Sequence, residues 1–296
     1  MRSIIPSELA IPELHQYLLG AVGPRPIAFV STIDAEGRVN LAPYSFFNIF
    51  SVNPPIAIFS PARRGRDNTT KHTYENAKQV PECVINVVNH AIVEHMSLAS
   101  TEYPAGVNEF VKSGLTAIDS DMVRPPRVGE SPVQLECKIN QVIELGQNGG
   151  AGNLVVCEII KIHIREEVLN AEGKIDPMKM DQVARMGGHW YTRANAGLFQ
   201  LPQPTTKIAI GFDRLPKDVL HSSVLTGSEL AQLAGVEHLP DETAVNEYKL
   251  IELPEVFIAH EDQPQELEKI LHQRAKTCLA AHDIEGAWKT LLAFNN

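Results

Sequence analysis

Cysteine is scarce in this sequence of 296 residues, and the cysteines that are present lack the spacings that hold metals. Metal sites and thioredoxin-like redox pairs need ligands at short, fixed separations, and no such pair occurs. The cysteines are far apart, and all but the last interrupt apolar runs: Cys83, Cys137, Cys157 and Cys278. We therefore expect buried, reduced thiols and no metal site.

Long apolar runs and an excess of basic residues are also missing. No apolar run approaches the roughly 18 residues of a membrane-spanning helix, and residues 1–19 carry acids and prolines where a signal peptide has an apolar core. Lys and Arg number 26 against 36 Asp and Glu, a formal charge of −10, which argues against nucleic acids and anionic membranes as partners. We expect a soluble cytoplasmic protein.

The short motifs of common catalytic and nucleotide sites are absent as well. Gly149, Gly150 and Gly152 lack the third glycine of the dinucleotide fingerprint, and no phosphate-binding G-x-x-x-x-G-K-[ST] motif occurs. Neither the zinc motif H-E-x-x-H nor the nucleophile elbow G-x-S-x-G is present. Hydrolase chemistry has no positive support.

What the first 200 residues do contain is a series of apolar, partly β-branched segments separated by turn residues. Strands are predicted at 25–32, 39–49, 56–59, 83–88, 133–145 and 154–164, and short helices at 70–78 and 91–100. Strands joined by short turns predict a mainly β protein with an antiparallel sheet, closed into a barrel. A doubly wound parallel fold is not expected.

The composition shifts after residue 200. Residues 201–204 are a plausible linker, and helical spacing appears at 228–235 and 265–294. We expect one domain at 1–200 and a partly helical C-terminal extension at 205–296. The extension could cap the barrel, extend a dimer interface, cover a ligand or simply pack on its own barrel.

Residues 63–73 are the most informative segment, because they are basic in an acidic chain. Four cations stand against Asp67, a local charge of +3, and short polar side chains are interleaved: Arg63, Arg64, Arg66, Lys71, Asn68, Thr69, Thr70 and Thr73. We expect a cradle for the phosphate of a small ligand, with Thr69 or Thr70 capping a helix whose N–H groups face the same anion. The alternative is a solvated turn that only caps the helix.

Two aromatic segments complete the candidate set. Strand alternation along 39–49 points Phe46 and Phe47 to opposite sides, so at least one could line a pocket for a planar ring, or both could fill cores. In 185–191, two glycines followed by His189, Trp190 and Tyr191 allow a flat ligand to approach, although a loop with a buried Trp reads the same way.

Taken in order, these segments resemble the FMN-binding split-barrel family of flavin reductases, which includes flavoredoxins and the reductase components of two-component monooxygenases. The resemblance spans about residues 20–195. It is carried by 24–32, Gly37, 40–45, Phe47, 54–55, 68–73, Asn76, 108–110, 114–116, 130–132, 135–137, 185–188 and Tyr191. His72 departs from the family, which commonly has Asp there.

The resemblance implies a six-stranded antiparallel split barrel that works as a homodimer with FMN near the subunit interface. The phosphate would be held by the basic stretch and the preceding strand end: Ser60, Arg64, Asn68, Thr69, Thr70, Lys71 and Thr73. The isoalloxazine ring and ribityl chain would contact Ser31, Thr32, Tyr44, Ser45, Phe47 and Asn48.

The same resemblance implies an NAD(P)H:FMN oxidoreductase in which nicotinamide passes a hydride to bound FMN. Such a step is mostly a matter of positioning, and His189 is the candidate catalytic side chain, with a structural loop histidine as the alternative. The partner would be a monooxygenase or another electron acceptor. Two alternatives stay open: a flavoredoxin-like electron carrier without direct NAD(P)H activity, and a non-catalytic FMN-binding module.

Overall fold

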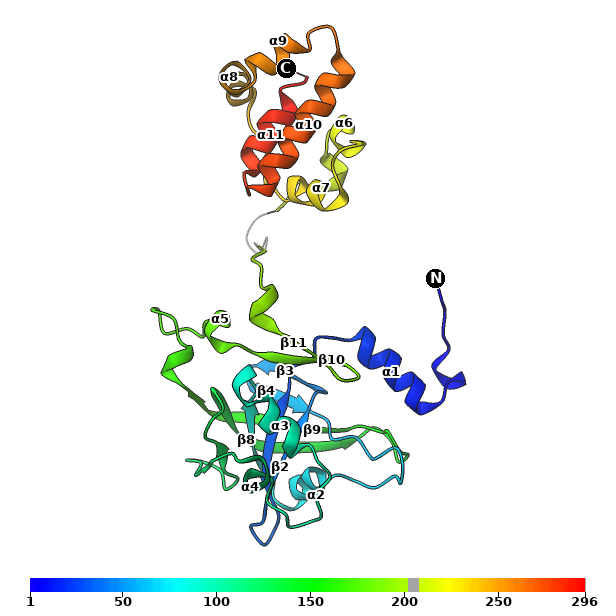
Figure 1. Cartoon of the computed structure of the whole chain (residues 1–296), viewed down its shortest axis with the longest axis vertical. Helices are drawn as coiled ribbons and strands as arrows, with labels where there is room; N and C mark the ends of the chain where they lie inside the picture. The colour runs from blue at the N-terminus through cyan, green and yellow to red at the C-terminus, as the bar shows by residue number, and fades with distance from the viewer. Residues whose placement is uncertain (202–207, 296) are drawn as a thin grey trace. The chain divides into compact units, whose positions relative to one another are not determined.

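The computed structural model describes residues 1–201 and 208–295 and divides the chain into two compact units, Met1–Phe199 and Gln200–Asn296 (Figure 1). Most of the linker expected at 201–204 lies outside the described residues. None of the helices in the described ranges is both long and apolar enough to cross a membrane.

The first unit is built on one antiparallel sheet, which confirms the mainly β prediction. The sheet has seven strands in the order β2-β1-β5-β8-β9-β4-β3. Their bounds are β1 Ala28–Ile33, β2 Val39–Tyr44, β3 Phe47–Val52, β4 Pro55–Phe59, β5 Glu82–Val87, β8 Val133–Glu144 and β9 Asn153–Ile164. Two small hairpins complete the strands: β6 Ala117–Ile118 with β7 Arg127–Val128, and β10 Val183–Gly187 with β11 Trp190–Arg193.

The expected count of six strands is wrong because the single strand predicted at 39–49 is two. The strand is interrupted at Ser45 and Phe46. Before this break β2 pairs with β1, and after it β3 pairs with β4. These two strands are the opposite edges of the sheet. Only two residues join them, and three Cα steps of about 3.8 Å reach roughly 11 Å, so the sheet must curve until the end of β2 lies within that distance of the start of β3.

Turn chemistry explains the first hairpin of the sheet. Asp34 accepts backbone hydrogen bonds from Glu36 and Arg38 at 3.0 and 2.8 Å, and Gly37 has a φ of +81°. Glycine adopts that left-handed conformation without steric cost. The turn therefore sets the register in which Ser31 faces Leu41 and Thr32 faces Asn40.

Helices cover the sheet and its ends. In the first unit they are α1 Ile11–Ala21, α2 His72–Gln79, α3 Val93–Ala99, α4 Glu109–Ser113 and α5 Pro177–Met180, with 3-10 turns at Pro6–Glu8, His90–Ile92, Glu166–Val168 and Ala194–Gly197. The sheet separates two cores, since Val30 packs with Phe59 and Ile85 on one face while Phe29 packs with Met96 of α3 on the other. Strand β1 is consequently buried along its whole length.

The expectation of buried, unpaired cysteines is confirmed for three of the four. Cys83, Cys137 and Cys157 are buried in the core of the first unit, and all four cysteines are free. Cys278 differs because it is partly exposed on α10. Burial raises the pKa of Cys157, which makes its thiol a packing group rather than a nucleophile.

The second unit is more helical than the sequence predicts. Its helices are α6 Lys217–Leu220, α7 Gly227–Ala234, α8 Glu242–Glu252, α9 Pro254–Ala259, α10 Pro264–Ala280 and α11 Ile284–Leu292, with a 3-10 turn at Phe212–Arg214. Pro254 begins α9 and Pro264 begins α10, because proline at the first turn of a helix costs no hydrogen bond. Trp288 and Leu233 are in its core, joined by a 3.1 Å bond from the indole N–H to the Leu233 carbonyl.

Leu233→Ala tests whether that core stabilises the second unit. We expect the free energy of unfolding to fall by about 2 to 5 kcal/mol, because the substitution leaves a cavity beside Trp288. Urea unfolding followed by tryptophan emission reports on the buried Trp288, since the other tryptophan, Trp190, is 77% exposed. Leu250→Ala is the matched control, since Leu250 is 76% exposed and should change less than about 0.5 kcal/mol. Equal stability of the two variants would contradict the core assignment.

Candidate functional site

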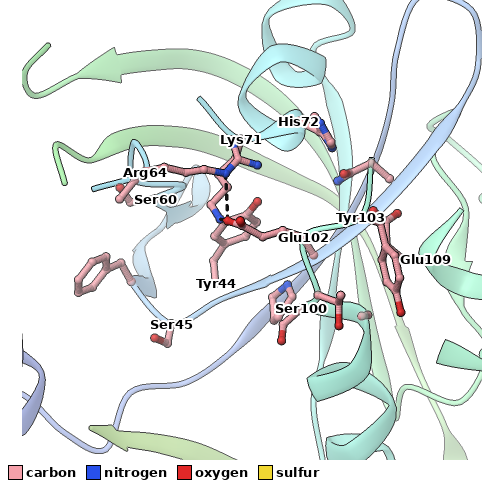
Figure 2. A pocket seen from close by; sticks show the side chains of 17 residues that line it. Tyr44, Ser45, Ser60, Arg64, Lys71, His72, Ser100, Glu102, Tyr103 and Glu109 are labelled. Carbon is pink, nitrogen blue, oxygen red and sulfur yellow. Dashed lines mark hydrogen bonds and ion pairs between the residues drawn. The ribbon is translucent and has the colours of Figure 1, made fainter. Parts of the chain in front are cut away.

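A pocket opens where β2 ends and the sheet closes on itself (Figure 2). Its wall combines the end of β2, the segment after β4, the start of α2, the segment after α3 and the start of α4. The lining residues are Asn40, Ala42–Phe46, Ser60, Ala62, Arg64, Lys71, His72, Ala99–Tyr103 and Glu109. We call this the cation pocket because Arg64 and Lys71 line it.

The basic segment converges on a single carboxylate in the cation pocket. Arg64 Nε and Lys71 Nζ are each 3.0 Å from Glu102 Oε1, and Arg66 Nη2 is 2.6 Å from Oε2. Hydrogen bonds from Lys71 and Arg64 lower the pKa of Glu102 to about 2. The cluster therefore holds an anion, and the three cations that bind it come from the segment that the sequence singled out.

The polar residues between these cations shape the loop and do not line the pocket. Arg64 donates to Thr69 Oγ1 at 3.0 Å and to the Thr70 carbonyl, and Asn68, with a φ of +58°, accepts from Arg63 Nε at 2.8 Å. The expectation that Thr69 or Thr70 caps the helix is wrong. The residue at that position is Lys71, its side chain makes no capping bond, and Thr70 donates to Glu75 instead.

Behind the pocket wall, a buried network orients Tyr44. The Tyr44 hydroxyl and Asn40 Nδ2 each donate to Thr73 Oγ1 at 2.8 Å, and Asn76 Nδ2 donates to Thr32 Oγ1 at 3.1 Å. Burial raises the pKa of Tyr44, so its hydroxyl stays protonated and donates. Thr32 and Thr73 thus act on the pocket through their neighbours, not by lining it.

A second pocket adjoins the first. It shares part of the wall with the cation pocket and adds an aromatic and a cation from the third segment: Ile27, Pro43, Tyr44, Ser45, Met96, Ser100, Arg185 and Tyr191. Arg185 Nη1 donates to the Tyr191 hydroxyl at 2.7 Å, and the guanidinium lies 4.7 Å from the centre of that ring. We call it the flat pocket, after the planar ring of Tyr191 and the planar guanidinium of Arg185 in its wall. The aromatic segments that the sequence singled out separately therefore meet here.

Several predicted site residues are outside both walls. Ser31 is buried and donates to the Pro126 carbonyl, Asn48 is exposed on β3, and Phe47 packs against the barrel core. His189 is exposed at the turn between β10 and β11 and lines neither pocket. The alternative of a buried tryptophan in this loop is wrong, because Trp190 is 77% exposed.

Two acidic residues line the cation pocket although the sequence analysis did not predict either of them as a site residue. Glu102 belongs to no motif, and only its approach to the cations reveals it. Glu109 is buried at the first turn of α4 and accepts a 3.0 Å bond from the Leu41 backbone N–H. Burial raises the pKa of Glu109. In the sequence, Glu109 could have been recognised by its position directly after Asn108, the residue that caps α4.

The curved antiparallel sheet of the first unit places it in the class of split-barrel proteins. The chain belongs to the family described as flavin reductase like domain, whose model matches residues 21–180. That match falls within the first unit.

Relatives and solved structures agree with this membership. The chain is 35% identical to an uncharacterized protein of Halalkalibacterium halodurans over 202 residues, 68% of this chain and 95% of the relative. It is similar to nitrilotriacetate monooxygenase component B from Bacillus cereus, with 30% identity, a TM-score of 0.64, and 68% and 98% of the two chains covered. It is also similar to the 2-nitrobenzoate 2-nitroreductase NbaA of Pseudomonas fluorescens, with 28% identity, a TM-score of 0.61, and 71% and 100% covered.

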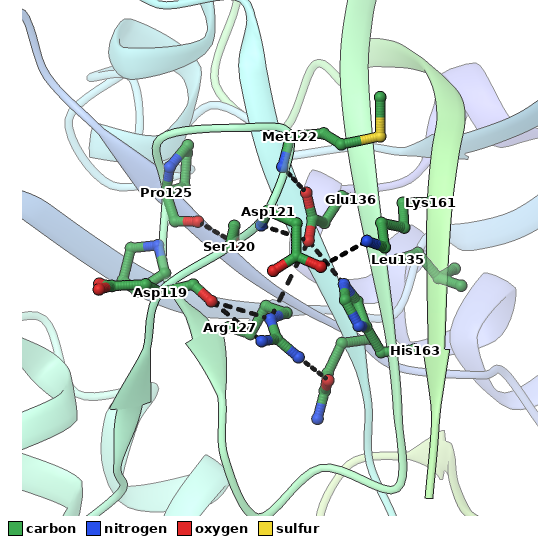
Figure 3. A network of polar contacts seen from close by, with 12 residues as sticks. Asp119, Ser120, Asp121, Met122, Pro125, Arg127, Leu135, Glu136, Lys161 and His163 are labelled. Atoms are coloured by element: carbon green, nitrogen blue, oxygen red, sulfur yellow. Dashed lines mark hydrogen bonds and ion pairs between the residues drawn. The ribbon is translucent and has the colours of Figure 1, made fainter.

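A cluster away from the pockets has the residue types of a metal site (Figure 3). The buried Glu136 accepts from the Asp121 and Met122 backbone N–H groups at 2.9 and 2.6 Å and from His163 Nε2 at 2.6 Å. Lys161 pairs with Asp121. Because protein donors already occupy these oxygens, we assign the cluster to anchoring the loop between β6 and β7 on the main sheet.

Glu136→Gln tests this anchor. We expect the free energy of unfolding at pH 7 to fall by about 2 kcal/mol, because the amide cannot replace a charged acceptor of backbone N–H groups. Burial alone would raise the pKa of Glu136, but the hydrogen bonds from Asp121, His163 and Met122 outweigh it and hold the pKa below its ordinary value.

The sign of the pH dependence follows from that lowered pKa. Its contribution to stability is present above the unfolded-state pKa of about 4.3 and is lost as the pH falls through the lower folded-state pKa. Urea unfolding at pH 7 and between pH 5 and 3 should therefore show the gap between wild type and variant closing in acid. Glu172→Gln, at a side chain 71% exposed, is the control. A gap that stays constant with pH would contradict the assignment.

Proposed function

We propose that the protein is an NAD(P)H:FMN oxidoreductase that passes reduced flavin or electrons to an acceptor such as a monooxygenase. The observation that carries the proposal is one continuous wall with cations at one end and a flat aromatic pocket at the other. Pro43, Tyr44, Ser45 and Ser100 belong to both pockets. A flavin mononucleotide has the same polarity, with a phosphate at one end of a ribityl chain and a planar ring at the other.

The residues of the cation pocket fit a phosphate monoester. Such a group carries a charge of about −1.5 to −2 at pH 7 and accepts several hydrogen bonds. Arg64 and Lys71 supply positive charge, Ser60 adds a hydroxyl at the end of β4, and the first N–H groups of α2 have no partner within the helix. Asn68, Thr69, Thr70 and Thr73 would hold these donors in place.

The residues of the flat pocket fit the ring. A bound flavin supplies the capacity to accept a hydride from nicotinamide, and the protein has to align the two rings and exclude water. Tyr44 and Tyr191 offer aromatic surface, and Ser45 offers a polar contact. The half-buried Arg185 lines this pocket, where its positive charge would stabilise negative charge on a bound ring.

The exposed edge of the sheet supports a homodimer. Strand β3 is an edge strand and exposes Ile49, Phe50 and Val52, with Phe50 and Val52 at 65% and 86% exposed. Exposed apolar edge strands are normally covered. Since β3 follows Phe46 of the cation pocket directly, covering it with a second copy would place the flavin near the subunit interface.

Phe50→Glu tests the dimer. In sedimentation velocity at micromolar concentration, wild type should run as a dimer and the variant as a folded monomer, because burying the new carboxylate is costly. Val111→Glu on α4, where the side chain is 76% exposed, is the matched control and should remain dimeric. A monomeric wild type, or a dimeric Phe50→Glu variant, would contradict this interface.

Anaerobic reduction tests the activity itself. We expect the purified protein to bind FMN, and the flavin absorbance to bleach when NADH or NADPH is added without oxygen. No bleaching with either nucleotide would contradict the reductase and leave the electron carrier or the non-catalytic module. Failure to take up FMN at all would contradict a flavin function of this site.

The same assay decides the proposed catalytic role of His189. A loss of reduction rate in His189→Ala, with FMN binding retained, would support that role. An unchanged rate would remove His189 from the mechanism and leave positioning by the two pockets as the basis of the reaction.

A further inference from the structure

The carboxylate of Glu102 lines the cation pocket beside its cations. Its Oε1 lies between Arg64 Nε and Lys71 Nζ, 3.0 Å from each, and its Oε2 is 2.6 Å from Arg66 Nη2. Two oxygens thus bridge three cations. That is the arrangement in which a phosphate would use the same donors, and Figure 2 shows the Glu102 side chain reaching toward Lys71 and Arg64.

We propose that Glu102 is a built-in counter-ion of the phosphate subsite, and that an incoming phosphate must displace it. This inference rests on the proposed function. The displacement follows from charge and geometry: a phosphate that took the Arg64 and Lys71 donors while Glu102 stayed would put two anions within a few ångströms of each other. At about 4 Å, two unit charges repel strongly near a protein surface, so one anion leaves.

Glu102 is able to leave because its own segment is a surface segment. The side chain is 38% exposed, so the displaced carboxylate can turn into water without a desolvation cost. The backbone around it is held by bonds between near neighbours, from Thr101 N to the Leu98 carbonyl and from Tyr103 N to the Thr101 carbonyl. Ser100 of the same segment also lines the flat pocket.

The counter-ion has two opposite effects. Without a ligand, it neutralises cations that would repel one another, so it stabilises the empty pocket with Arg64 and Lys71 already in place. With a phosphate ligand, it competes for the same donors and weakens binding. If Glu102 only supported the fold, or only oriented the cations, its substitution would lower both the stability of the ligand-free protein and its affinity for a phosphate ligand.

Glu102→Gln separates these effects, because it keeps the size and the carbonyl acceptor but removes the charge. We expect the affinity for FMN to rise about fivefold to tenfold, in line with an ion-pair network of modest strength, while the affinity for riboflavin, which has no phosphate, stays the same. The melting temperature of the flavin-free protein should fall. Titration calorimetry with FMN and riboflavin, and with inorganic phosphate as competitor, measures these quantities.

Glu167→Gln is the matched control. Glu167 pairs with Arg165 at 3.3 Å, is 68% exposed and lines neither pocket, so its loss should leave both flavin affinities unchanged. If wild type prefers FMN to riboflavin but Glu102→Gln binds FMN equally or more weakly, the counter-ion is overturned and the proposed function stands. If wild type binds FMN and riboflavin equally, the phosphate site itself is overturned, and the counter-ion with it.

Discussion

The closure of the sheet is the constraint on which the rest of the first unit depends. Strands β2 and β3 are opposite edges of a seven-stranded sheet, yet Ser45 and Phe46 alone connect them. A link that short holds the end of β2 close to the start of β3, so the sheet between them has to curve. The pocket is a consequence, because the same link and the end of β2 form the wall shared by the cation pocket and the flat pocket.

Electrostatics then separates the two ends of that wall. The chain carries a formal charge of −10, so most of the protein surface repels a phosphate ligand. Arg64 and Lys71 line the cation pocket, and Glu102 pairs with both of them and with the neighbouring Arg66. The cations thus come from one short segment, whereas the flat pocket combines Tyr44 and Tyr191 with polar side chains such as Ser45.

The candidate site was partly predictable, and the residues show where prediction stopped. Arg64, Lys71, Ser60, Tyr44 and Ser45 line the cation pocket. Arg64 and Lys71 lie in a segment whose local composition is unusual, whereas Ser60, Tyr44 and Ser45 were expected only from the family resemblance. Other predicted residues, among them Ser31 and Asn48, lie on neighbouring strands without facing either pocket. A family pattern marks a strand as part of the site, but the register and twist of the sheet decide which face each side chain takes.

The sequence by itself determined the mainly β architecture and the cation-rich segment. These features depend on alternation and on composition within a few residues, which local physics controls. Only the tertiary structure decided that Glu102 would meet Arg64 and Lys71, 38 and 31 residues away along the chain, and that Tyr44 would share a pocket with Arg185 and Tyr191. Those contacts join segments that are far apart along the chain, and no pattern within a single segment determines how a curved sheet brings such segments together.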